Sequence, residues 1–111
     1  MPTPSRPSIS VRRSLQKLGE DVRSARLRRG LPAEVVAERA RTTRPTLSRI
    51  ERGDPGVGIG LYAAVLQSLG FLDRLGELAD PRHDEVGLAM ATEALPKRAR
   101  TRRARTTHER P

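Results

Sequence analysis

Residues 43–52 bring together side chains that can hydrogen-bond to a nucleic acid. Arginine can donate two hydrogen bonds to guanine O6 and N7, while threonine offers a methyl group to thymine or a hydroxyl to other bases. Proline has no donor, so it can only make an apolar contact or shape the start of a helix. The candidates for base contact are Arg44, Pro45, Thr46 and Arg49.

A second group of side chains is suited to phosphate oxygens. Phosphate contacts position a protein on a duplex but carry no sequence information directly. We place Arg52 in this group because it lies near the end of the run. The candidates for phosphate contact are Arg23, Arg39, Arg41, Thr43, Ser48 and Arg52, with Arg28 and Arg29 as further basic residues. The competing interpretation for each arginine is plain surface charge, and for residues 44–52 a solvated helix face.

Two short helices must position these side chains. Apolar residues recur at spacings of three and four over residues 32–40 and 44–52, which predicts a helix in each segment. Thr43 can N-cap the second helix, because its hydroxyl can accept from a free amide. Gly53 can supply the left-handed residue that ends it. A short helix, a tight turn and a basic helix form a helix-turn-helix, whose second helix enters the DNA major groove.

The rest of the chain predicts an all-α fold. We expect a first helix over residues 11–29, a fourth over 59–69, a fifth over 72–79 and a weaker helix over 84–95, with no strand pattern. Tyr62 and Phe71, the only aromatic residues, are expected to pack rather than to stack on bases. The expected core consists of Leu15, Leu18, Val22, Val36, Ala37, Leu47, Ile50, Val65, Leu66, Leu69, Leu75 and Leu78.

Composition divides the chain into four parts. Residues 1–10 are rich in proline and serine and are expected to be disordered. Residues 11–80 form the predicted DNA-binding domain, and residues 81–96 a linker or short helix. The basic tail, residues 97–111, has no apolar residue larger than alanine, so we expect it to be disordered. Its expected use is contact with phosphates or docking on an acidic partner.

Charge is unevenly distributed along the chain. The net charge is +9 and the pI about 11.5, which is typical of a nucleic-acid binder. Residues 10–53 carry twelve Lys/Arg against five Asp/Glu, and residues 97–111 carry seven against one. Residues 54–96 carry only two against seven, so this acidic part is expected to face solvent or a different partner.

Several classes of function have no support in the sequence. The chain has no cysteine, and His83 and His108 are far apart, so we expect no metal site and no cofactor. Asp80 and Asp84 are a carboxylate pair in sequence only, without a nucleophile and base, so we expect no enzyme activity. No apolar run is long enough to span a membrane and no signal peptide is recognisable. We therefore expect a cytoplasmic, nucleoid-associated protein.

Residues 18–31 and 43–53 resemble the Xre family of helix-turn-helix regulators, the Cro-type repressors, through the run Ser48-Arg-Ile-Glu-Arg-Gly53 above all. The resemblance implies a five-helix, lambda-repressor-like domain with a structural salt bridge between Arg26 and Glu51. Ala33 replaces a glutamine that contacts phosphate in many members. Arg41 replaces a turn glycine, and a left-handed arginine costs about 1 kcal/mol or more. Either Arg41 regains this by binding phosphate or the turn has another geometry.

A narrower resemblance covers the second half of the chain. Its segments Glu-Arg-Gly-Asp-Pro, Tyr-Ala-Ala-Val-Leu, Ala-Asp-Pro and Leu-Pro-Lys-Arg are similar to those of HipB-like antitoxins, which are made beside HipA-like kinase toxins. The resemblance implies an autoregulating antitoxin of a toxin–antitoxin operon, with a kinase-like toxin as partner.

The leading hypothesis is thus a sequence-specific repressor that binds a near-palindromic operator in double-stranded DNA as a homodimer. The expected dimer surface lies on the fifth helix and the segment after it, at Leu72, Leu75, Val86, Leu88 and Met90. The alternatives are a stand-alone regulator, a protein-interaction module that inhibits a toxin with incidental DNA binding, and a non-specific nucleic-acid binder.

Overall fold

The computed structural model describes residues 6–94 of the chain. The expectations for residues 1–5 and for the basic tail concern residues outside this range. The chain divides into two units, the first extending to Leu75 and the second beginning at Gly76. Each unit is described by itself.

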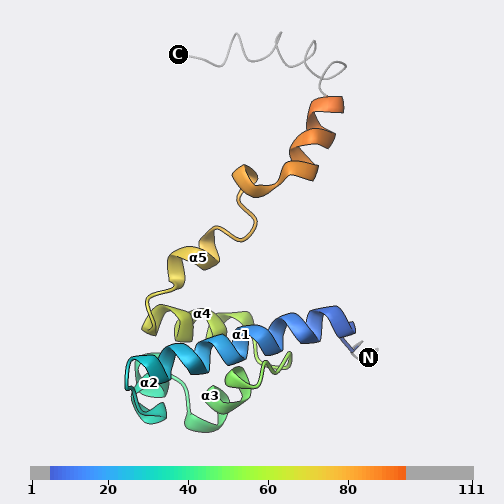
Figure 1. Ribbon diagram of the computed structural model, residues 1–111. Helices are drawn as coiled ribbons and strands as arrows, with labels where there is room; N and C mark the ends of the chain where they lie inside the picture. The colour runs from blue at the N-terminus through green and yellow to red at the C-terminus, as the bar shows by residue number, and fades with distance from the viewer. Residues whose placement is uncertain (1–5, 95–111) are drawn as a thin grey trace, which may run out of the picture. The chain divides into compact units, whose positions relative to one another are not determined.

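The first unit is built from one long helix followed by shorter ones (Figure 1). In chain order they are α1 (Ile9–Arg28), α2 (Ala33–Arg39), α3 (Arg44–Glu51), α4 (Ile59–Ser68) and α5 (Leu72–Gly76), which continues one residue past the boundary between the units. No strand occurs in residues 6–94, and the predicted all-α fold is confirmed. The observed bounds of α2, α3 and α4 lie within one residue of those expected.

The first and last of these helices differ from expectation. The Ser8 hydroxyl accepts a hydrogen bond from the Val11 amide at 3.1 Å, so α1 begins at Ile9, and the expected disorder is wrong for Ile9 and Ser10. At the other end, α5 stops at Gly76 instead of residue 79. Leu78 is therefore not a core residue, since 76% of it is exposed.

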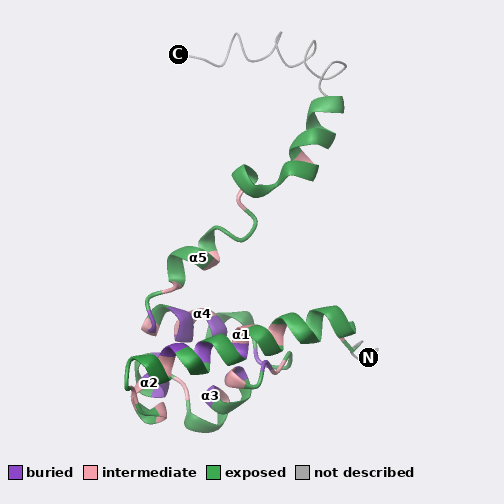
Figure 2. Ribbon diagram, viewed as in Figure 1, coloured by how far each residue is buried: buried purple, intermediate pink, exposed green. Residues whose placement is uncertain are grey.

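The core lies where α3 packs against α1 and α2, and where α2 packs against α4. Figure 2 shows the buried positions along these helices. The buried apolar residues are Val22, Ala25, Val36, Ala37, Ala40, Leu47, Ile50, Val57, Tyr62, Val65, Leu66 and Leu69. Three further residues that were expected in the core, Leu15, Leu18 and Leu75, are half-buried. Phe71 packs against this core, and the Arg29 guanidinium lies 5.2 Å from its ring centroid.

Two glycines allow α1 to cross the end of α3 at close range. A Cβ atom on Gly19 would lie 2.6 Å from the backbone oxygens of both Ile50 and Glu51. Gly53 has a φ of +74°, and a Cβ there would collide with the backbone of Leu15. Backbone therefore meets backbone at this crossing, where no side chain larger than hydrogen fits.

The second unit contains a 3-10 helix, Pro81–His83, and a helical segment over residues 85–94. The Asp80 carboxylate accepts from the Arg82 amide at 2.8 Å and so caps the 3-10 helix. The helix expected over residues 84–95 is present as far as the described residues extend. None of residues 76–94 is buried, and the exposed apolar residues here include Leu78, Val86, Leu88 and Met90.

Candidate nucleic-acid interface

Helix α3 has two chemically different faces. Leu47 and Ile50 are fully buried and hold the inner face against the core. Four exposed residues, spaced by three and four, share the outer face because such residues are neighbours on a helix. These residues are Pro45, Ser48, Arg49 and Arg52. The outer face therefore presents two arginines and a hydroxyl to solvent, and the exposed Arg44 stands at the start of the helix.

The start of α3 is held by Thr43, as predicted. Its hydroxyl accepts from the Thr46 amide at 3.3 Å and lies 3.1 Å from the Thr46 hydroxyl. Pro45 occupies the first turn, where its missing amide leaves no bond unmade. Thr46 is half-buried with its hydroxyl engaged, so of the four base-contact candidates it is the least accessible.

The turn between α2 and α3 contains a left-handed arginine, one of the two alternatives that the resemblance left open. Arg41 has a φ of +56° and is the one non-glycine residue with positive φ among those described. The alternative of another turn geometry is therefore wrong. The Arg41 side chain is exposed, next to the start of α3.

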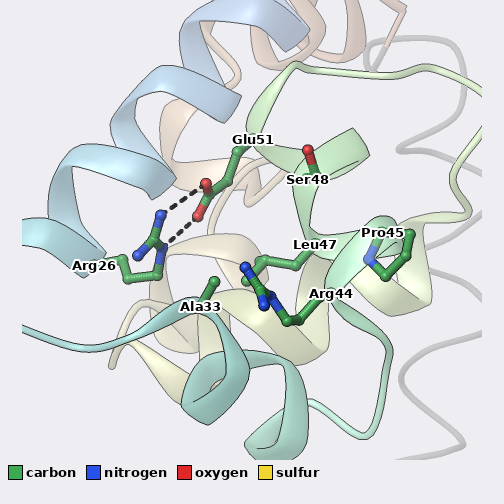
Figure 3. A pocket seen from close by; sticks show the side chains of 7 residues that line it. All are labelled: Arg26, Ala33, Arg44, Pro45, Leu47, Ser48 and Glu51. Atoms are coloured by element: carbon green, nitrogen blue, oxygen red, sulfur yellow. Dashed lines mark hydrogen bonds and ion pairs between the residues drawn. The ribbon is translucent and has the colours of Figure 1, made fainter.

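The inner end of α3 is tied to α1 by the expected pair of Arg26 and Glu51 (Figure 3). Arg26 donates from Nε to Oε2 at 2.7 Å and from Nη2 to Oε1 at 3.1 Å, which is a bidentate pair. Its Nη1 donates to the Leu31 carbonyl at 3.0 Å. Only 12% and 9% of the two side chains are exposed. The hydrogen bonds to Glu51 raise the pKa of Arg26, so its guanidinium stays charged at any physiological pH.

An open hollow of about 620 Å³ lies beside α3 (Figure 3). Ala33, at the first position of α2, contributes only a methyl group, so no polar side chain stands at this point. Arg44 lies within 3.5 Å of Glu34, and both side chains are largely exposed. The lining residues are Arg26, Ala33, Arg44, Pro45, Leu47, Ser48 and Glu51.

Arg49 is anchored by a residue that the sequence analysis missed. Its Nε donates to Asp54 Oδ2 at 2.8 Å, and the two side chains are 44% and 33% exposed. Asp54 follows the helix-ending Gly53 in an Asp-Pro-Gly turn. The available signal was an acidic residue five positions after an arginine, directly after a helix end.

The candidates for phosphate contact lie on or beside three different helices. Ser48 and Arg52 share the outer face of α3, where Arg52 Nη1 donates to Ser48 Oγ at 2.7 Å. Arg23 lies on α1 and Arg39 at the end of α2, and both are exposed. Among the described residues, no hydrogen bond or ion pair joins either one to α3.

Two other features do not occur in the part of the chain that the structure describes. No three histidine, cysteine, aspartate or glutamate side chains gather there as metal ligands. Within the same residues, no helix is both long and apolar enough to cross a membrane.

Comparison with known proteins identifies a family for a segment that lies mostly in the first unit. Residues 17–79, more than half of the chain, match the family model of the helix-turn-helix domain. No curated protein and no solved structure matches the chain. The match includes α2, the left-handed turn and α3, and helix-turn-helix domains of this architecture bind DNA. The chain belongs to the helix-turn-helix domain family.

Proposed function

We propose that the protein is a sequence-specific repressor that binds a near-palindromic operator in double-stranded DNA. The observation that carries this proposal is that α3 has an inner face packed against the core and a basic outer face exposed to solvent. Pro45 and Arg49 lie on the outer face, where a helix in the major groove meets base edges. Ser48 and Arg52 are suited to phosphates, and Arg41 in the adjoining turn offers a further phosphate contact. The proposal assigns the protein no catalytic step.

Selection from a randomised duplex library tests this function. The wild-type protein should enrich a defined sequence and protect it in footprinting on the protein's own promoter. It should bind that duplex at least 10³-fold more tightly than random DNA, the low end for specific binders. Equal binding to all duplexes with steep salt dependence would instead indicate a non-specific nucleic-acid binder.

We propose further that the protein acts as a homodimer. Helix-turn-helix dimers read two half-sites about one helical turn apart, which makes their operators near-palindromic. In the first unit Leu72 is exposed and Leu75 is half-buried, and in the second unit Val86, Leu88 and Met90 are exposed, so each unit offers apolar side chains to a second copy. Light scattering at high micromolar concentration should give twice the chain mass. A monomer that protects a single half-site would contradict the proposal.

An antitoxin role is a finer form of the same proposal. It is supported by the similarity of residues 51–55 and of the later segments to HipB-like antitoxins. In that role the protein represses its own operon and binds a kinase-like toxin. A kinase-like reading frame beside the gene, together with co-purification of its product, would support the role. A gene with no such neighbour would indicate a stand-alone regulator in the nucleoid.

The second unit supports one competing function, a protein-interaction module. Residues 76–94 bury nothing, carry five acidic residues against one basic, and expose large apolar side chains. This combination suits a partner with a basic, apolar surface. Two results together would favour this function. The wild type should select no DNA sequence, and the variant with both Arg49 and Arg52 replaced by alanine should still inhibit the toxin fully.

A further inference from the structure

Asp54 has every polar group engaged at the end of α3. Its amide donates to the Arg49 carbonyl at 2.9 Å, and its own carbonyl accepts from the Tyr62 hydroxyl at 2.8 Å. Oδ1 accepts from the Gly56 amide at 2.7 Å, and Oδ2 accepts from Arg49 Nε at 2.8 Å. The carboxylate is therefore fixed at both oxygens, and the hydroxyl of the buried Tyr62 holds the backbone carbonyl.

The surrounding turn leaves room for the guanidinium of Arg49. A Cβ atom on Gly56 would lie 3.2 Å from Arg49 Nη2 and 3.1 Å from Asp54 Oδ1. Both distances are tighter than ordinary packing, so a side chain at this position would press on the two partners of the pair. Glycine here keeps the pair undistorted.

The part of Arg49 that Asp54 holds is the part that a guanine contact does not need. A guanidinium carries five N–H donors in a rigid fork. Bonding at Nε leaves the two terminal amino groups, whose parallel donors match guanine O6 and N7. An arginine that is already held in one orientation loses less conformational freedom when it binds, so its contact becomes more selective.

A carboxylate on a surface that faces DNA is unfavourable for binding, because it repels phosphate. The hydrogen bond from Arg49 lowers the pKa of Asp54, and the Gly56 amide lowers it further. Asp54 is therefore ionised at neutral pH and opposes general attraction to DNA at the very residue it orients.

We propose that Asp54 is a positioning residue that orients Arg49 toward a guanine and thereby sets the base preference of the protein. This inference rests on the proposed function, because it assumes that the outer face of α3 reads bases. Asp54 itself contacts no base. Its effect is to favour the guanine-containing site over other DNA rather than to tighten binding to all DNA.

The substitution Asp54→Asn tests this role, because asparagine keeps an acceptor for Gly56 but loses the charge that holds Arg49. The probes are the duplex enriched by the wild type, the same duplex with each guanine replaced in turn by 7-deazaguanine, and a random duplex. Asp80→Asn is the matched control: Asp80 also pairs with a nearby arginine, Arg82, at 3.1 Å, but in the second unit. Melting temperature is measured for both variants.

We expect Asp54→Asn to reduce the preference for the enriched duplex over random DNA by about fivefold, the low end for a whole base contact. Sensitivity to 7-deazaguanine should fall at one position, and adding Asp54→Asn to Arg49→Ala should cause no loss of preference beyond that of Arg49→Ala alone. Asp80→Asn should leave the preference unchanged.

Three results would overturn the role of Asp54. Equal tightening on both duplexes would make Asp54 a general repulsive charge. Unchanged preference would separate it from recognition. A lower melting temperature with equal weakening on both duplexes would make its role structural. If the wild type enriches no sequence at all, the proposed function fails instead, and this result is distinct from the other three.

Discussion

Helix α3 takes part in two arginine–carboxylate pairs that have nearly the same length but differ in their exposure to solvent. Arg26 and Glu51 meet at 2.7 Å on the inner side, with about a tenth of each side chain exposed. Arg49 and Asp54 meet at 2.8 Å on the outer side and remain substantially exposed. The inner pair fixes α3 to α1, while the outer pair fixes a side chain that faces solvent. The surroundings, not the bond lengths, separate a stabilising pair from one suited to recognition.

The largest effect should come from breaking the inner pair. Glu51→Ala leaves the Arg26 guanidinium buried without its partner, and removal of one member of a buried pair costs about 3–5 kcal/mol. Thermal unfolding should show a much lower Tm. Glu34→Ala removes the partner of Arg44 from an exposed pair and should leave the Tm nearly unchanged. An equal Tm for Glu51→Ala and the wild type would mean that the two pairs of α3 do not differ.

The outer pair should instead govern DNA selection. Arg49→Ala should cost about 1–3 kcal/mol on the preferred duplex and little on random DNA, since one base contact is lost. The Tm should stay close to that of the wild type. Arg52→Ala is the control: it should weaken both duplexes alike and lower the salt slope by about 0.9. Equal weakening by Arg49→Ala on both duplexes would assign Arg49 to phosphate contact.

The turn before α3 offers a smaller effect of opposite sign. Arg41→Gly removes a left-handed arginine, so the free protein should gain about 1 kcal/mol of stability, measured by chemical unfolding. Binding to random DNA should weaken, because a phosphate contact is lost, while base preference is kept. If the variant is more stable and binds random DNA as tightly as the wild type, Arg41 makes no contact with phosphate.

The smallest expected effect is a change in thermal stability at acidic pH. The pKa of Asp54 lies below its usual 3.8, so the outer pair contributes stability above that pH and loses it as pH falls through the lowered pKa. The Tm difference between the wild type and Asp54→Asn should be constant from pH 7 to about pH 5 and vanish in stronger acid. A difference that changes near neutral pH would implicate another group.

Most of the helix-turn-helix in the first unit could be predicted from local sequence patterns. Thr43 caps α3 and Gly53 ends it, because each outcome depends on a residue and its immediate neighbours. The left-handed position of Arg41 followed from the resemblance and was one of two alternatives. The pair of Arg26 and Glu51 came from the resemblance to known regulators.

The features that sequence did not predict depend on the path of the chain. Asp54 meets Arg49 only because the turn after Gly53 folds back along α3. The spacing of Leu72, Leu75 and Leu78 fits a longer helix, but α5 stops at Gly76 and the second unit offers Leu78 nothing to pack against. The crossing of α1 and α3 requires two distant glycines that no periodic pattern connects.

That crossing has a consequence for genetics. In a saturation screen for lost DNA binding, positions 19 and 53 should tolerate glycine alone, as strictly as any position that contacts a base. Neither glycine has a side chain with which to touch DNA, and even the conservative change to alanine places an atom inside the backbone of the opposite segment. Intolerance to substitution would thus occur at the crossing of α1 and α3 as well as at the DNA-contact surface. Only a folding assay on each variant would distinguish a loss of folding from a loss of DNA contact.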